Sequence, residues 1–123
     1  MSVRVERVAS LIKEEVGTLF QRHFLMEEYG FMTVTEVRMS PDLKNAKIYV
    51  SVFGDETRKQ RTLTLLEGQK QFVRSAIGKA VRMKFVPTVT FFLDETMDQA
   101  VKLEKIFKKI HDGDASPQSG ENS

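Results

Sequence analysis

A regular alternation of apolar and polar residues over positions 45–53 constrains the fold of this chain more than any other feature. Successive side chains of a strand point to opposite faces of a sheet, so this segment has one face to bury and one to expose. The buried face would hold Ala46, Ile48, Val50 and Val52. Residues 31–39 are also rich in Val, Thr and Phe, with a slip in the alternation that suggests a β-bulge. The turn residues at 40–43, SPDL, lie between the two segments and predict an antiparallel hairpin.

Helical periodicity precedes the hairpin. From Val5 to Phe20 apolar residues recur at steps of three and four, which lines one helical face. We expect this helix to be capped by Ser2, because its hydroxyl can accept a backbone N–H of the first turn, and to end near Phe24. Residues 27–30 read as a loop.

A second helical pattern follows the hairpin over residues 56–83. It contains Gly68 and Gly78, which are unfavourable inside a helix, and we expect a kink near Gly78. Pro87 ends the pattern and favours an extended backbone before it. Residues 88–93 then predict a third strand.

The order of these elements predicts the α+β class, with helices covering one face of a three-stranded sheet. A last amphipathic helix is expected over residues 97–111, and residues 112–123 contain too little apolar surface to pack and are expected to be disordered. At 123 residues, the chain has the length of one domain, which we place at residues 1–111.

Charge is unevenly distributed along the chain. The net charge is only +2, yet residues 68–93 contain no Asp or Glu. The basic residues of that stretch are Lys70, Arg74, Lys79, Arg82 and Lys84. A surface of one sign is typical of a protein that binds a phosphate backbone, so RNA or DNA is the first partner to consider.

Helical projection places part of this charge on one outward arc. Arg74, Lys79 and Arg82 share that arc with Gly78, which would let another backbone approach closely. Arg4 and Arg7 form a second basic patch on the first helix. A solvated helix face is the alternative interpretation, but such a face usually mixes both signs of charge.

No pattern indicates catalysis or a cofactor. His23 and His111 are far apart, and neither has the spacing of metal ligands or lies beside a nucleophile. The absence of cysteine excludes disulfides and thiolate zinc sites, and none of the glycines forms a phosphate-binding loop. We expect a non-enzymatic protein with no metal and no small-molecule substrate. No apolar run is long enough to span a bilayer, so we expect no membrane contact and a cytoplasmic location.

Residues 4–94 resemble the ribosome-binding factor A family, a group of bacterial assembly factors for the small ribosomal subunit. The opening helix resembles the family in Arg4-x-x-Arg7-Val8, Ile12 and Glu15. The hairpin gives the most specific match, Val37-x-x-Ser40-Pro41-Asp42-Leu43-x-x-Ala46-x-Ile48-Tyr49-Val50-Ser51. The later part matches in Arg74-x-x-x-Gly78-x-x-x-Arg82-x-x-x-Val86-Pro87-x-Val89-x-Phe91-Phe92-Leu93-Asp94.

The resemblance implies a KH-like fold of the bacterial topology, α-β-β-α-kink-α-β. In this family a kink of the form Ala-x-Gly replaces the GxxG clamp of true KH domains. Ala76 and Gly78 would supply that kink here. Residues 27–30 depart from the family, many members of which have an Asp-Pro-Arg stretch there.

The resemblance also implies a function. Such a protein binds the immature small (30S) subunit through its 16S ribosomal RNA, assists late maturation and processing of the 16S precursor, and matters most in the cold. We expect it to act as a monomer. The RNA ligands would be Arg4, Arg7, Lys70, Arg74, Lys79, Arg82 and Lys84.

Two alternatives stay open. The chain could be a protein-binding adaptor, with Tyr49, Phe53 and Phe92 as aromatic anchors, or these rings could pack under the terminal helix. It could also be a general RNA-binding module without preference for the ribosome.

Overall fold

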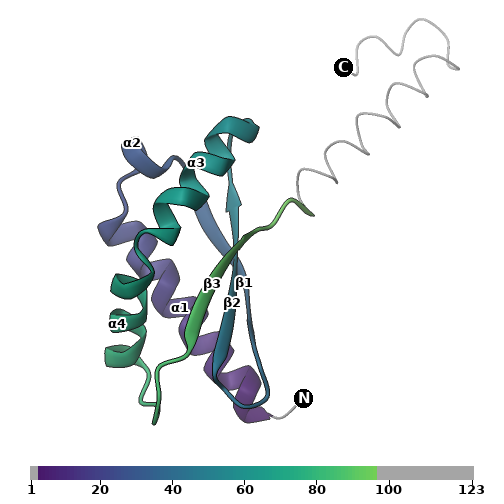
Figure 1. The fold of residues 1–123 in the computed structure, drawn as a ribbon, viewed down its shortest axis with the longest axis vertical. Coiled ribbons are helices and arrows are strands. Elements are labelled where there is room, and N and C mark those ends of the chain that lie inside the picture. Colours follow the sequence, from purple (N-terminus) through teal and green to yellow (C-terminus); the bar gives the residue numbers. More distant parts are fainter. Residues whose placement is uncertain (1–2, 97–123) are drawn as a thin grey trace, which may run out of the picture.

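Three strands form one mixed sheet, and the helices cover one face of it (Figure 1). The computed structural model describes residues 3–96. Strand β1 (Met32–Met39) pairs antiparallel with β2 (Asn45–Val52), and β2 pairs parallel with β3 (Thr88–Leu93). The sheet order is therefore β1-β2-β3, and the predicted α+β class is confirmed.

The hairpin prediction is confirmed, including its bulge. The register of β1 against β2 shifts between Val34 and Glu36, which leaves Thr35 as the extra residue. The Thr35 hydroxyl donates a 2.5 Å hydrogen bond to the carboxylate of Asp94, just beyond the end of β3. This bond connects the two outer strands, and it lowers the pKa of Asp94 because it favours the charged carboxylate.

The core lies between the sheet and the long helix α1 (Val3–His23). Ile12 and Val16 of α1 are fully buried, as are Ile48 and Val50 of β2. The predicted alternation of β2 is thus observed as alternating burial. On the opposite face of the sheet the rings of Tyr49 and Phe92 stack, with centroids 5.4 Å apart.

A short helix, α2 (Met26–Tyr29), replaces the loop predicted over residues 27–30. The backbone N–H groups of Glu28 and Tyr29 both donate to the carbonyl of Leu25, which closes one turn. Tyr29 is buried and stacks on Phe24 at 4.9 Å, so packing of this ring stabilises a turn that local sequence does not indicate. Burial also raises the pKa of the Tyr29 hydroxyl.

The predicted helix over residues 56–83 is two helices, α3 (Glu56–Glu67) and α4 (Lys70–Ala80). The break lies at Gly68 and Gln69, where the N–H of Gln69 donates to Leu66, three residues back, and tightens the last turn of α3. Ala76 and Gly78, where the kink was predicted, both lie within α4.

Helix α4 ends at Ala80, earlier than predicted, and residues 81–87 connect it to β3. Val81 has an extended backbone, with φ −112° and ψ 117°, and its side chain is buried in the core. Burying this β-branched residue favours leaving the helix. The predicted Ser2 cap, the helix over residues 97–111 and the tail over residues 112–123 lie outside the described residues.

Candidate nucleic-acid interface

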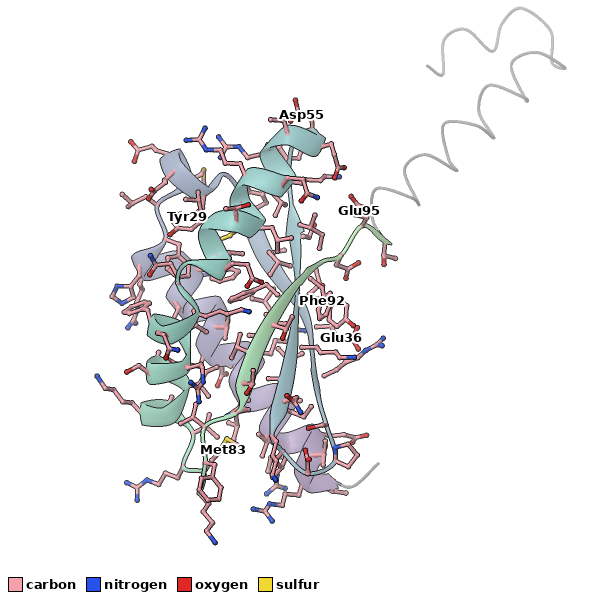
Figure 2. All side chains as sticks on the ribbon, in the orientation of Figure 1. Tyr29, Glu36, Asp55, Met83, Phe92 and Glu95 are labelled. Atoms are coloured by element: carbon pink, nitrogen blue, oxygen red, sulfur yellow. The ribbon has the colours of Figure 1, made fainter. Side chains whose placement is uncertain are left out.

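Three segments that are distant in the sequence lie at one end of the sheet: the start of α1, the turn between β1 and β2, and the connection from α4 to β3 (Figure 1). Met83, in that connection, is labelled at this end in Figure 2. The N–H of Thr88 donates a 2.8 Å hydrogen bond to the carbonyl of Lys44, which joins the connection to the turn. We call this part of the molecule the basic end. The exposed basic residues of these segments and of the last turn of α4 are Arg4, Arg7, Lys44, Lys79, Arg82 and Lys84.

Two hydrogen bonds from Arg74 join α4 to the connection. Its Nε donates to the carbonyl of Pro87 at 3.0 Å, and its Nη2 donates to the carbonyl of Val86 at 3.2 Å. Gly78 faces the same segment, since a Cβ on Gly78 would lie 2.9 Å from Cγ2 of Val86. The close approach predicted at Gly78 is thus made by Val86 of this chain. We infer that Arg74 and Gly78 position the connection.

The connection presents three exposed side chains between buried ends. Val81 and Pro87 are buried, whereas Arg82, Lys84 and Phe85 are exposed. The ammonium group of Lys84 lies over the ring of Phe85, 5.7 Å from its centroid, within the range of a cation–π interaction. Cations and an aromatic ring therefore occupy the same exposed stretch.

The turn between β1 and β2 holds Lys44 in place. Leu43 has φ 63°, a left-handed conformation that costs roughly 1–3 kcal/mol in a residue other than glycine, and its side chain packs against the core. Oδ1 of Asp42 accepts hydrogen bonds from the Ser40 hydroxyl at 2.6 Å and from the N–H of Lys44 at 3.0 Å. These bonds lower the pKa of Asp42, so this acid at the basic end already has its partners within the turn.

The structure divides the seven predicted RNA ligands into two groups. Arg4, Arg7, Lys79, Arg82 and Lys84 are exposed at the basic end. Arg74 bonds the connection instead, and Lys70 pairs with Glu67 at 2.6 Å. Lys70 begins α4 and Lys79 lies in its last turn, so about 14 Å of helix separates them. The seven predicted ligands therefore do not all lie at the basic end.

Two residues of this region are not among the ligands that the sequence predicted. Lys44 is brought to the connection by the parallel pairing of β2 with β3, which pairs Asn45 with Thr88. Phe85 lies beyond Met83, where the predicted helix ends, so helical periodicity could not predict the direction of its side chain. A separate signal was present for Phe85, since it lies between Lys84 and Val86 in a segment without acids.

The part of the chain that the structure describes holds no cluster of metal ligands. Residues 3–96 contain no group of three or more His, Cys, Asp or Glu that could hold a metal ion. His23 contacts the ring of Phe72 edge-on, with centroids 5.5 Å apart. Over the same residues, no helix is long and apolar enough to cross a membrane.

The aromatic anchors of the adaptor alternative lie away from the connection at the basic end. Tyr49 stacks on Phe92, and the guanidinium of Arg38 lies 5.3 Å from the centroid of the Tyr49 ring. Arg38 also bonds Glu36, and this hydrogen bond is the main reason why the pKa of Arg38 is raised. Phe53, the third anchor, is 80% exposed beyond the other end of β2. The three rings thus do not form one cluster.

Comparison with known proteins gives consistent matches. The family model for ribosome-binding factor A matches residues 4–107. A ribosome-binding factor A from Desulforamulus reducens is 36% identical over 117 residues, 95% of this chain and 98% of the relative. The crystal structure of ribosome-binding factor A from Thermus thermophilus has a TM-score of 0.64 at 22% identity, covering 72% of this chain and 94% of that one. A homology model of the Thermus thermophilus protein, fitted into the cryo-EM map of its complex with the 30S subunit, has a TM-score of 0.61 at 23% identity, covering 70% and 90%.

The fold and the basic end define a small α+β module with a cationic surface at one end of its sheet. Such a surface is suited to a polyanion. The chain belongs to the ribosome-binding factor A family. Its strand order and its antiparallel and parallel pairings agree with the KH-like fold that the resemblance implied, with α2 as an addition.

Proposed function

We propose that this protein is a non-enzymatic assembly factor that binds the immature small ribosomal subunit through its 16S ribosomal RNA. Membership of the family supports the partner, and one structural neighbour is a relative fitted in a complex with the 30S subunit. The observation that carries the proposal for this chain is the meeting of exposed cations from three segments at one end. The protein acts in the cytoplasm as a monomer, through residues 1–111 as one RNA-binding domain.

The RNA ligands in this proposal are the exposed basic residues of the basic end: Arg4, Arg7, Lys44, Lys79, Arg82 and Lys84. Each cation that neutralises a phosphate releases a counterion, so affinity falls steeply as salt rises. Arg74, Ala76 and Gly78 contribute indirectly, because α4 holds the connection that carries two of the ligands. Lys70 has a minor role, since its partner Glu67 opposes an approaching phosphate.

Assistance in assembly follows from preferential binding. Low temperature stabilises incorrect RNA helices, which slows late maturation and end-processing of the 16S precursor. A protein that binds the RNA only in its mature-like geometry lowers the free energy of that state and raises its population. Deletion of the gene is therefore expected to delay 16S maturation most in the cold.

The salt dependence of binding tests the interface. We would measure the affinity for immature small subunits across a salt series, and compare the wild type with the double variant Arg82→Gln/Lys84→Gln. The slope of log affinity against log salt is expected to fall by about two units. The matched control is Arg22→Gln/Arg61→Gln, which removes two exposed charges outside the basic end and should leave the slope unchanged. Equal slopes for the two double variants would refute the interface.

A pull-down with ribonuclease separates the proposal from the adaptor alternative. Association with small subunits that is lost on ribonuclease treatment supports RNA binding, and association that survives supports a protein contact. Comparison of immature subunits with arbitrary RNA of equal length tests the general RNA-binding alternative. Equal affinity for both would favour that alternative.

A further inference from the structure

Phe85 is an exposed aromatic residue of the connection at the basic end. Its side chain is 68% exposed, although its neighbours in the connection include the buried Val81 and Pro87 and the half-buried Val86. A single exposed apolar side chain is common and by itself indicates nothing. Here two charged residues accompany it, since Arg82 and Lys84 are exposed on the same connection, 81–87.

The ring has one face towards a cation. The ammonium group of Lys84 lies over it at 5.7 Å from the centroid, and most of the side chain is exposed to a ligand. A nucleotide offers both groups that this pair can bind, a flat base for the ring and a phosphate for the ammonium. Proteins that bind single strands combine a basic groove with aromatic rings in this way, because every base has a π-face.

The backbone that carries Phe85 is fixed before any ligand binds. Val81 is buried on one side of it and Pro87 on the other. The carbonyls of Val86 and Pro87 accept the two hydrogen bonds of Arg74. A ligand that contacts Phe85 therefore has little loop entropy to overcome, which favours affinity.

We propose that Phe85 stacks on an unpaired base of the RNA, while Arg82 and Lys84 bind the phosphates on either side of that base. The inference rests on the proposed function and adds the class of RNA that the site prefers. A continuous duplex supplies phosphates but keeps both faces of its bases stacked. A junction or bulge with an unstacked base supplies phosphates and also a free base face, so the site prefers such a structure.

The test uses the full chain and immature small subunits, with affinity measured across a salt series. Phe85→Leu is expected to bind about tenfold more weakly with an unchanged salt slope, because stacking is lost and the phosphate contacts stay. Phe85→Tyr should bind like the wild type, since it retains the ring. The matched control is Phe72→Leu, which alters a partly exposed ring on α4 that contacts His23 and Phe24. Thermal unfolding of each variant verifies that it is folded.

The source of the contact is tested with deproteinised 16S precursor RNA. A tenfold loss for Phe85→Leu on this RNA supports stacking on a base. A loss that occurs only when ribosomal proteins are present, or a Phe85→Leu affinity within twofold of the wild type, overturns the inference alone. If the wild type fails to bind subunits in a salt-dependent manner, the proposed function is wrong and the inference falls with it.

Discussion

The two ends of the sheet have opposite surface chemistry. The basic end gathers cations from three segments. The other end, formed by α2 and the adjoining ends of β1, β2 and α3, is called the apolar end below (Figure 1). Its exposed apolar residues are Leu25, Met26, Phe31 and Phe53, and its acidic residues include Glu27, Glu28, Asp55 and Glu56.

The separation of the ends contributes to a cationic surface on a chain of net charge +2, although the acids Glu6 and Asp42 lie among the cations of the basic end. Strands β1 and β2 each contain eight residues, which corresponds to a length of about 25 Å. The Debye length at physiological ionic strength is about 8 Å. Acids at the apolar end therefore do little to weaken the field at the basic end, and net charge is a poor guide to what this molecule binds.

The largest effect on stability is expected at the apolar end. Gly30 has φ 77° and ψ −176°, a region that is almost restricted to glycine, and a Cβ there would lie 3.2 Å from Cδ of Arg58. Gly30→Ala should lower the free energy of unfolding by about 2 kcal/mol and leave the affinity for immature subunits unchanged. Urea denaturation and binding measure the two effects. Gly17→Ala is the control, because that position in α1 has open space and should gain stability. A loss of affinity in folded Gly30→Ala would show that the ends are coupled.

A smaller effect is expected at the basic end from Gly78→Ala. The added methyl group meets Cγ2 of Val86, at a cost of about 1–3 kcal/mol, and replacing glycine in a helix returns about 0.5–1 kcal/mol. Stability should therefore fall by about 1 kcal/mol, and binding should weaken as the connection shifts. The double variant Gly78→Ala/Val86→Ala removes the contact and should bind better than Gly78→Ala. Failure of this rescue would exclude the contact as the cause.

Acid should weaken the hydrogen bond between Thr35 and Asp94, which joins the outer strands β1 and β3. The pKa of Asp94 is lowered below its ordinary 3.8, first by the Thr35 hydroxyl. Its contribution to stability is thus fully present above that ordinary value and is lost as pH falls through the lowered pKa. Asp94→Asn should unfold with a shallower pH dependence below pH 4 than the wild type. Identical slopes in denaturation series at several acidic pH values would contradict the role of this bond.

The smallest effect is expected from Phe53→Ser at the apolar end. Phe53 is 80% exposed, so its replacement should change the free energy of unfolding by less than about 0.5 kcal/mol. Affinity for deproteinised RNA should not change. Weaker binding of Phe53→Ser to complete subunits would reveal a protein contact at this end and restore the adaptor alternative.

Local patterns predicted the parts of the fold that local rules determine. The alternation of β2 and the slip in β1 were sufficient for the hairpin and its bulge, because side-chain direction in a strand has a fixed period. The position of the helix break was not predictable from glycine content. Gly68 and Gly78 are both compatible with a helix, and the choice between them depends on how α3 and α4 pack on the sheet.

The candidate site was predictable only in part for the same reason. The absence of acids from residues 68–93 located Arg82 and Lys84 correctly within an exposed basic segment. A projection at 100° per residue could not show that the chain turns back after Ala80, so it placed Arg74 among the outward cations. Lys44 needed the parallel pairing of β2 and β3, which joins residues more than forty positions apart.

The hydrogen bond from Thr88 to Lys44 has a mechanical consequence. It joins the hairpin turn to β3, so a force applied to the turn is shared with β3. An RNA bound to the turn and to the connection would have to break this hydrogen bond before it could separate the two segments. In the proposed interface, the hold on a folded RNA would therefore depend on the stiffness of the sheet behind the surface as well as on its charges.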